Sequence, residues 1–389
     1  MARIAPQRSP RRLAVASGVM FFANGAIYGN WIPRLPEIKD RLEVTNSGLG
    51  VALLGGGIGG LVGSLVVGAI MSRWGSRRLA ITTLYVLPVV MVFVAFVGEP
   101  WMLLLVLSAI GIFDVCADVA VNAQGVIAQE QLGRSIMNRL HGLWSLGFAT
   151  GTLVGSLCAG LQVDLRVQVI VVAVLILVAV QRSAQWLEPT DSAHHTDDVR
   201  PDSRRHLGFV AVVIAVVAAG AIALEGIPNE WGALLMRDVF GSGSWAGFGT
   251  AAFGIGMLLG RFSGDHVQER IGARHMFQIA TALIAIGLIS VVLTSISWVA
   301  LVGLFLSGVG QSVIFPRLYL LAARVPGMSA GAGLGALMVG LRIGGMATTL
   351  GMGALADAFD VRWALGVVSL IAFALLIAAN ASFSRRVAV

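Results

Sequence analysis

The chain has 389 residues, of which 57% are hydrophobic and 12% are charged, and its mean hydropathy is +0.86. Water-soluble domains carry about 25% charged residues, so this composition excludes an ordinary soluble globule. The net charge of +7 raises the question of nucleic acid, but no soluble segment is long enough to present a basic face, and we expect no such partner.

Twelve apolar runs of about 20 residues follow one another, and a helix of that length crosses the roughly 30 Å of a hydrocarbon core. The predicted spans cover residues 13–33, 47–71, 79–98, 102–127, 140–161, 165–186, 207–235, 246–262, 276–294, 298–323, 332–356 and 361–384. We therefore predict an all-α membrane protein with twelve transmembrane helices in two pseudo-symmetric six-helix bundles. Residues 1–187 form the first bundle, residues 188–206 a polar linker, and residues 207–389 the second bundle.

The chain has 27 basic residues, and most of them lie in the termini, in the linker and in the turns after even-numbered spans. Because basic residues favour the cytoplasmic side of a membrane, we predict that both termini and the linker are cytoplasmic. The location is then a bacterial-type inner (plasma) membrane, crossed many times. The two cysteines, Cys116 and Cys158, lie within predicted spans and indicate no disulfide framework.

One signature occurs twice at a constant offset of 197 residues. Residues 57–77 read Gly-Ile-Gly, three residues, Gly, nine residues, Arg-x-Gly-x-Arg, and residues 254–274 repeat this pattern. Such spacing is typical of a duplicated membrane unit. We expect each copy to be a membrane helix, a short basic loop and the start of the next helix.

Polar side chains are few within the spans, and a charge at a helix centre costs about 2.5–3.5 kcal/mol, so each one is a candidate for function. Counting 1.5 Å per residue places Asn24, Asp114, Gln311 and Arg342 near mid-membrane, on four different helices. The sequence therefore predicts a polar site at the membrane midplane.

The fourth span is the most polar, because Asp114, Asp118 and Asn122 recur every four residues and so share one helix face. Removal from water makes a carboxylate easier to protonate, so the two acids are candidates for a proton or cation relay that lines a cavity. The alternative is a network of hydrogen bonds between helices with no role in transport.

Glu225 lies late in the seventh span, beside Gly226 and Pro228, which open a helix locally. Its carboxylate is a candidate second protonation site or part of a substrate gate, with an ordinary helix end as the alternative. For Glu230 and Trp231 we expect a position at the membrane interface, where tryptophan is enriched.

Arg342 is the cation at mid-depth. Because an unpaired guanidinium is costly there, we expect it to face Asp114, Asp118 or an anionic group of the substrate. A purely structural ion pair is the competing interpretation. Arg139 and His141 lie at the inner end of the fifth span, and His141 is a candidate proton acceptor.

Two six-helix halves, a central linker and basic turns after the second and eighth spans resemble the major facilitator superfamily (MFS) over essentially the whole chain. The family's turn pattern is Gly, three residues, Asp, Arg, x, Gly and two basic residues. Ser72 replaces the acid in the first copy, whereas in the second copy Glu269 occupies that position and Asp265 replaces the leading glycine. The resemblance implies a cytoplasmic gate, which we assign to Arg73, Arg77, Asp265, Glu269, Arg270, Arg274, Arg139 and His141.

Finer matches, Gly142-Leu-Trp144-Ser-Leu-Gly147 and Asp118-x3-Asn122, resemble the fucose-permease-like branch, which includes the YbjJ-type permeases. Fucose permease places one coupling acid in helix 1 and another in helix 4. Asp114 or Asp118 matches the second of these, whereas the first span offers only Asn24, Tyr28 and Asn30. We assign proton coupling to Asp114, Asp118 and Glu225, and substrate binding to Asn24, Tyr28, Asn30, Asn122, Gln311 and Arg342.

We therefore predict a secondary active transporter, not an enzyme, that moves a small polar or amphipathic solute by alternating access. Protons are the expected coupling ion, while sugar-type symport and efflux by antiport both stay open. The expected partners are the substrate, protons and the lipid bilayer, for a monomer with no metal or cofactor. The alternative is a polytopic membrane enzyme of the prenyltransferase kind that binds a metal diphosphate at Asp114 and Asp118.

Overall fold

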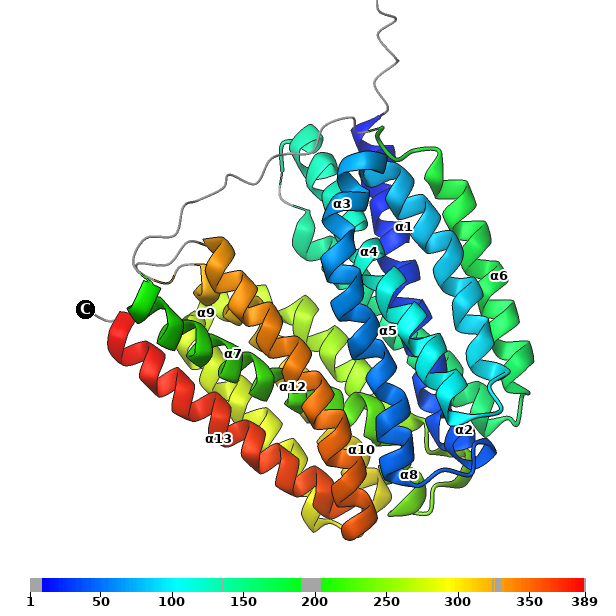
Figure 1. Cartoon of the computed structure of the whole chain (residues 1–389). Coiled ribbons are helices and arrows are strands. Elements are labelled where there is room, and N and C mark those ends of the chain that lie inside the picture. The colour runs from blue at the N-terminus through cyan, green and yellow to red at the C-terminus, as the bar shows by residue number, and fades with distance from the viewer. Residues whose placement is uncertain (1–8, 135, 190–203, 324, 326–329, 388–389) are drawn as a thin grey trace, which may run out of the picture.

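The computed structural model describes residues 9–134, 136–189, 204–323, 325 and 330–387, and the regular structure within these ranges is helical, with no strand. The first half contains α1 (Pro10–Trp31), η1 (Ile32–Arg34), α2 (Leu35–Arg41), α3 (Asn46–Val92), η2 (Phe93–Ala95), α4 (Pro100–Leu132), α5 (Met137–Gly160) and α6 (Leu165–Ala184). Figure 1 shows these helices packed side by side as one group.

The second half repeats this order. It contains α7 (Arg204–Gly226), the π-helical turn η3 (Ile227–Trp231), α8 (Gly232–Asp238), η4 (Gly243–Trp245), α9 (Phe248–Leu293), α10 (Ser297–Gln311), α11 (Ile314–Ala323), α12 (Ala330–Ala358) and α13 (Val361–Val387). The helix α7 begins at Arg204, three residues before the predicted end of the linker at residue 206. Residues 190–203, which make up most of the predicted linker, lie outside the described part.

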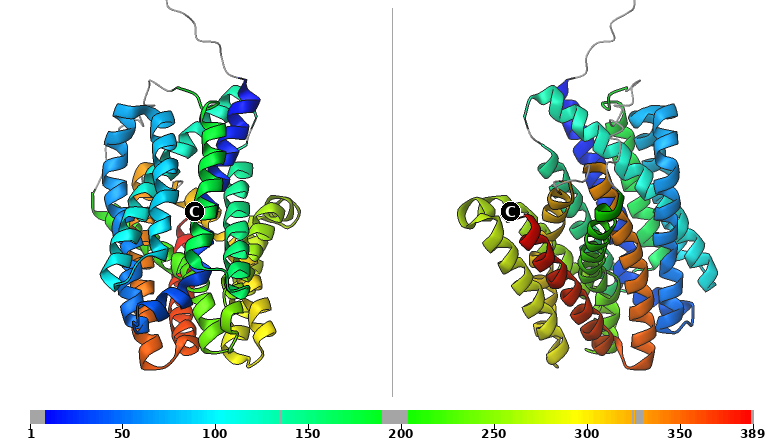
Figure 2. Two further views of the ribbon diagram at one scale, coloured as in Figure 1. Left: turned by 90° about the vertical axis from the view of Figure 1, so that its right-hand side faces the viewer. Right: turned by 60° about the vertical axis from the view of Figure 1, so that its left-hand side comes forward.

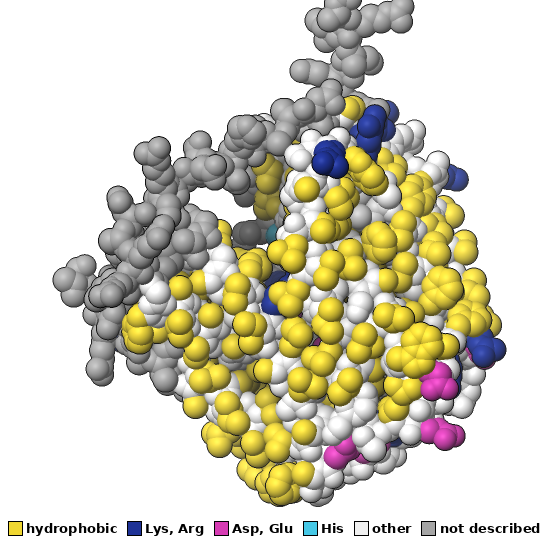
Figure 3. Space-filling model, in the orientation of Figure 1, with side chains coloured by type: hydrophobic (Ala, Val, Ile, Leu, Met, Phe, Trp, Pro, Cys, Tyr) yellow, Lys and Arg dark blue, Asp and Glu magenta, His cyan; other side chains and the backbone are white. Residues whose placement is uncertain are grey.

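The twelve predicted spans are confirmed once two kinks are taken into account. The helices α3 and α9 each contain two predicted spans, while α10 and α11 together make one. Within the described residues, eight helical segments are long and apolar enough to cross a membrane by length and composition alone, and α3 counts once among them. Apolar side chains cover much of the face seen in Figure 3, and large exposed apolar side chains occur in both halves, as lipid contact requires.

Each basic turn is tighter than the predicted loop. The chain reverses between two helices at a single non-helical residue, Gly75 in α3 and Gly272 in α9, with φ of 72° and 78°. These two glycines are equivalent at the offset of 197, and only glycine adopts this conformation without strain. The central glycine of each Arg-x-Gly-x-Arg motif is thus a conformational requirement.

Helix ends follow the usual local signals. The side chain of Thr45 accepts a hydrogen bond from the Gly48 backbone N–H at the start of α3, and Asp164 does the same for Arg166 at the start of α6. Pro100 occupies the first turn of α4, where its missing N–H is not needed, and Gly133 ends that helix with a φ of 62°.

The small residues of the repeated motif allow helices to touch through their backbones. A Cβ atom on Gly59 of α3 would collide with the carbonyl oxygen of Ser108 in α4, and a Cβ atom on Gly256 of α9 would collide with that of Phe305 in α10. Gly59 and Gly256 are equivalent at the same offset, so the duplication preserves this contact. The glycines of this signature in α3 and α9 therefore serve helix packing.

The two halves converge at one end and diverge at the other. We call the end with Gly75 and Gly272 the turn face, and the end with α2 and α8 the far face. Figure 2 shows the short helices and loops gathered at the far face, and Figure 1 shows α3 and α12 close there but apart toward the turn face. The space-filling view in Figure 3 shows a hollow between the halves that opens toward the turn face.

Replacement of Gly272 by Ala is expected to lower stability by about 1–3 kcal/mol, because a side chain at φ 78° and ψ 155° is strained. The measurement is thermal unfolding of the purified protein in detergent. Gly68→Ala is the matched control, because Gly68 is helical in the same region of the other half and has open space at its Cβ position. A Gly272→Ala protein as stable as this control would contradict the assignment of strain.

Candidate functional site

The first half contributes a hydrogen-bonded group in the middle of the bundle. Asn24 of α1 donates from Nδ2 to Oδ1 of Asp114 in α4 at 3.0 Å, and its Oδ1 accepts from the Trp144 indole N–H of α5 at 2.7 Å. Tyr28, one turn further along α1, is also within hydrogen-bonding reach of Asp114. Three helices thus meet at one amide, and the predicted shared level of Asn24 and Asp114 is confirmed by their contact.

Arg342 of α12, in the second half, extends toward the same group. Its guanidinium lies directly against the Cα of Gly60 in α3, where any larger residue would displace it. It interacts electrostatically with Asp114 and Asp118 of the first half, and with Tyr28. The expectation that Arg342 faces these acids agrees with this geometry, and Gly60 supplies the room.

The two acids of α4 differ in their surroundings. Asp118 is exposed and accepts a hydrogen bond of 2.9 Å from Asn122, which also donates to the Asp118 carbonyl oxygen. Asp114 instead is bonded to a different helix. Of these two acids, therefore, only Asp114 forms a side-chain hydrogen bond to another helix among the described residues, so only its charge can directly affect the contact between α1 and α4.

The second half has polar residues at the equivalent positions, but the acid lies on the other helix of the pair. The offset of 197 relates Tyr28 to Glu225, and Asp114 to Gln311. Gln311 of α10 donates from Nε2 to the Ala221 carbonyl oxygen of α7 at 2.9 Å and lies within hydrogen-bonding reach of Glu225. Each half thus holds one acid beside a neutral polar partner, on opposite members of the helix pair.

Arg261 is a site residue that the sequence analysis does not single out. It extends from α9 into the first half, where Nη1 donates to Oγ of Ser145 at 2.6 Å and the guanidinium lies 5.6 Å from the Trp144 ring centre. Within its own half it faces Glu225. The sequence does contain a signal for Arg261, because it falls inside the predicted span 246–262. That span places it next to the membrane surface, whereas the helix continues to Gly272 and places Arg261 further from the turn.

The expectation of an interfacial Trp231 is wrong. Its side chain is fully buried, with 0% exposure, at the end of the π-helical turn η3. The neighbouring Glu230 accepts a hydrogen bond of 3.0 Å from the Thr349 hydroxyl of α12. A π-helical turn disrupts regular helical bonding and directs these side chains into the protein instead of toward the membrane surface.

The far face is closed by contacts between the halves. Arg237 of α8 donates from Nη1 to the Pro36 carbonyl oxygen and to Oδ2 of Asp40 in α2, both at 2.7 Å. Its Nε also donates to Asp238 at 2.6 Å, and Lys39 lies 3.9 Å from that carboxylate. Four charged groups from two halves therefore lie in one cluster, which we call the far-face latch.

A second far-face contact joins α12 to α3. The carboxylate of Asp357 accepts hydrogen bonds from the backbone N–H groups of Asn46 and Ser47, at 2.8 and 2.9 Å. These are the first residues of α3, whose amides have no partner within the helix. The second half thus caps a helix of the first half.

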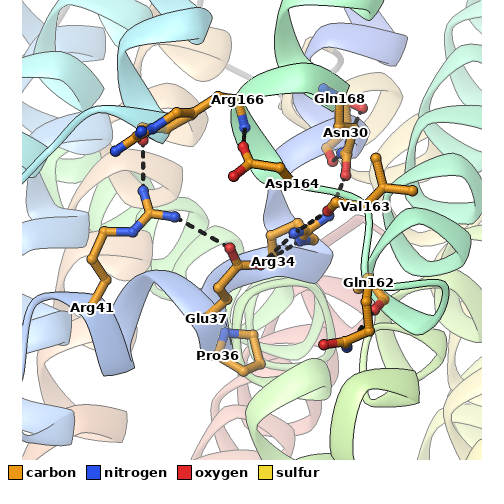
Figure 4. A network of polar contacts seen from close by, with 12 residues as sticks. Asn30, Arg34, Pro36, Glu37, Arg41, Gln162, Val163, Asp164, Arg166 and Gln168 are labelled. Atoms are coloured by element: carbon orange, nitrogen blue, oxygen red, sulfur yellow. Dashed lines mark hydrogen bonds and ion pairs between the residues drawn. The ribbon is translucent and has the colours of Figure 1, made fainter.

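Asn30, a predicted substrate ligand, lies in a polar network within the first half (Figure 4). Gln168 of α6 donates to both the backbone and the side-chain oxygen of Asn30, at 2.8 and 3.0 Å. Arg34 donates to Gln168 at 2.6 Å and forms an ion pair with Glu37. Asn30 Nδ2 also donates to Sδ of Met91 in α3, at 3.8 Å, so its hydrogen-bond partners among the described residues lie within the first half. The binding role of Asn30 stays a prediction.

The predicted gate residues lie near the turn face. Arg73, Glu269, Arg270, Arg274 and Arg139 are exposed, and Arg77 is half-buried. His141 packs edge-on against Phe21, with ring centres 5.1 Å apart, and faces Arg261. The side chain of Asp265 lies outside the described part. The gating assignment stays a prediction for this group.

The arrangement defines a class of protein. Two six-helix halves, closed at one face and open at the other, share a site with acids from both halves and two arginines from the second half, an arrangement typical of polytopic secondary transporters. The chain is similar to MFS-type transporters in sequence and has their fold, as the following comparisons show.

Comparison with curated proteins agrees with this class. No protein-family model matches the chain. Over 94% of its length it is 26% identical to an uncharacterized MFS-type transporter of Yersinia pestis and 28% identical to the uncharacterized transporter y4wD of Sinorhizobium fredii, with 95% of each covered. It is 26% identical over 82% of its length to the membrane protein MosC of Rhizobium meliloti, 77% of which is covered. Relatives named as transporters favour a transporter and not an enzyme.

Solved structures show the same fold. The D323A mutant of the nucleoside transporter NupG matches with a TM-score of 0.78 at 12% identity, over 95% of this chain and 99% of that one. A bacterial homologue of the human lysosomal transporter Spinster, inward-facing and occupied, matches with a TM-score of 0.70 at 13% identity, over 96% and 97% of the two chains. The predicted MFS fold is thereby confirmed, while the fucose-permease-like branch stays a prediction.

Substitution of Arg237 by Ala is expected to open the far face, because it removes the group that joins Asp40 and Pro36 to the second half. The measurement is the distance between spin labels at Leu161→Cys and Leu293→Cys, two exposed far-face positions in different halves, in a background without native cysteines. The population at longer distances should increase. Arg166→Ala is the control, because Arg166 packs over Phe96 within one half, and an unchanged distribution in Arg237→Ala would refute the latch.

Proposed function

We propose that the protein is a proton-coupled transporter in which Asp114 carries the coupling proton. The observation that carries this proposal is the Asn24–Asp114 hydrogen bond at mid-depth, with Arg342 of the other half facing the same carboxylate. An acid placed between two mobile halves makes their attraction depend on its charge. Asp118 is the less favoured acid, because its hydrogen bond stays within α4.

The turn face is cytoplasmic in this proposal. The basic residues of both Arg-x-Gly-x-Arg turns support that orientation. The halves touch at the far face and part toward the turn face, so the conformation is inward-open. The likeness to an inward-facing Spinster homologue agrees with this assignment.

The coupling follows from charge balance. When Asp114 is ionised, it attracts Arg342 across the interface and holds α12 against α3. When Asp114 takes up a proton, that attraction is lost, while Asn24 still offers its amide oxygen and nitrogen. Uptake and release of one proton thus change the free energy of contact between the halves, which is the requirement for coupled alternating access.

The substrate in this proposal is a small polar or amphipathic solute. Asn24, Tyr28 and Arg342 supply donors and acceptors near one another. Trp144 stacks on Phe148 with ring centres 5.6 Å apart and an angle of 6°, which adds a flat apolar element beside them. This combination suits a solute with one apolar face and several hydrogen-bonding groups.

Replacement of Asp114 by Asn is expected to abolish accumulation driven by a pH gradient while exchange of substrate without a gradient persists. Asn keeps the shape and the hydrogen bond but does not titrate. The measurement is uptake into proteoliposomes of a compound first identified by thermal shift. Asp360→Asn is the control, because Asp360 caps α13 at the far face and Asn caps equally well. Gradient-driven uptake at the wild-type level by Asp114→Asn would refute the assignment.

Arg342→Lys is expected to weaken substrate binding at least about tenfold, since one charge-assisted hydrogen bond contributes about 1.5–3 kcal/mol and Lys lacks the planar fork. The measurement is the dissociation constant by calorimetry in detergent. Arg362→Lys is a control for a guanidinium that packs over Phe240 in the second half. An affinity equal to wild type would show that Arg342 does not bind the substrate through two bonds.

A further inference from the structure

The helix α3 carries a groove next to its reversal at Gly75. The groove has a volume of about 340 Å³ and is lined by Trp74, Arg78, Ile81 and Thr82. The last three are spaced so that they share one face of the helix that follows Gly75. Trp74, Arg78 and Thr82 are exposed. A cation and an aromatic ring thus lie together at an open groove, which we call the α3 groove.

The α3 groove lies at the level where the membrane surface is expected. The predicted span begins at residue 79, so Arg78 directly precedes the apolar run, and Ile81 and Thr82 lie within its first turn. Tryptophan and arginine are suited to the boundary between hydrocarbon and headgroups. Figure 3 shows Lys and Arg side chains at the turn-face end of the first half, with apolar side chains over much of the surface below them. The α3 groove is therefore placed to meet the headgroup layer.

An exposed apolar stripe continues from the α3 groove along the same helix. Val89 and Phe93 are exposed and follow Thr82 by seven and eleven residues, so the three share one face. Eleven residues at 1.5 Å each span about 16 Å, which is about half of the hydrocarbon core and hence the depth of one leaflet. A molecule that fills the groove and follows this stripe has a polar head and an apolar tail.

The charge beside the α3 groove is positive. Residues 72–78 include three arginines, Arg73, Arg77 and Arg78, and no acid. Among the residues that the structure describes, neither Arg73 nor Arg78 forms an ion pair with a carboxylate. An exposed guanidinium at this level suits a phosphate group, which accepts two parallel N–H hydrogen bonds from it.

The duplicated turn of the second half lacks these features. The offset of 197 relates Trp74 to Ile271 and Arg78 to His275, and the second segment includes the acid Glu269. The tryptophan, the second of the paired basic residues and the excess of positive charge therefore belong to the first half alone. A basic turn that served only to orient the chain in the membrane would not require this difference.

We propose that the α3 groove binds an anionic phospholipid, with the phosphate at Arg78, the headgroup against Trp74 and one acyl chain along Val89 and Phe93. The occupant is a lipid and not free phosphate, because the exposed stripe continues the groove into the hydrocarbon. Attraction of basic side chains to anionic lipid supplies the preference over a zwitterionic lipid. The proposal depends neither on proton coupling nor on the orientation of the chain in the membrane.

Quenching by spin-labelled lipids tests this site in the reconstituted full-length protein and needs no substrate. A fluorophore is attached at Val89→Cys in a background without native cysteines. The membranes are phosphatidylcholine with a small fraction of phosphatidylglycerol, or of phosphatidylcholine, that carries a nitroxide on one acyl chain. The association constant from quenching is expected to be about fivefold higher for phosphatidylglycerol, the factor that one arginine near the membrane surface contributes. Added salt should reduce this preference.

The duplication supplies a matched reporter position. Ile286 is equivalent to Val89 at the offset of 197, and the two side chains are 56% and 47% exposed. A fluorophore at Ile286→Cys therefore samples lipid at the same depth beside a helix without the groove residues. The two spin-labelled lipids should quench it equally.

Arg78→Gln should abolish the preference for phosphatidylglycerol at Val89. Arg134→Gln is the control, because Arg134 follows α4 on the same face of the same half, is exposed and loses the same charge, and it should retain the preference. A preference that survives Arg78→Gln, or one that is equal at Ile286, would overturn the proposal and would indicate only a general attraction to the basic turns. Displacement of the lipid by inorganic phosphate at constant ionic strength would also overturn it, because the acyl chain would then contribute nothing.

Discussion

Helices in lipid gain no hydrophobic stabilisation from touching each other, so this fold depends on close contact between backbones. Gly59 against Ser108 and Gly256 against Phe305 bring the second and fourth helices of each half within backbone contact. That approach places α4 beside α3, and therefore Asp114 near the interface to which Arg342 extends. The polar site is possible because glycine packing fixes the helices around it.

The same duplication explains why the halves are not equivalent in chemistry. Exchange of Tyr28 for Glu225, and of Asp114 for Gln311, keeps a pair of polar residues at one level while it moves the acid to the other helix. The arginines are not exchanged in this way, because both belong to the second half. A symmetric scaffold thus carries an asymmetric set of charges.

Much of this could be predicted from the sequence, because apolar run length, the repeated motif and the rarity of charge in lipid are strong signals. They locate Asn24, Asp114 and Arg342 at one depth, and the structure brings them together. Span boundaries are weaker signals. The predicted end at residue 262 places Arg261 at the membrane surface, so it is not recognised as a site residue. Trp231 was misplaced because nothing local reveals a π-helical turn, which depends on packing against neighbouring helices.

The reversal of the chain at Gly75 and Gly272 has a mechanical consequence. Because only one non-helical residue joins the two helices, their ends at the turn face are held together and cannot slide past each other. Each half therefore contains one stiff hairpin, and displacement of its inner arm carries the outer arm through the lipid with it. Bilayer thickness therefore acts on both helices of each hairpin together, because a hydrophobic mismatch at one helix is passed to the other through the turn.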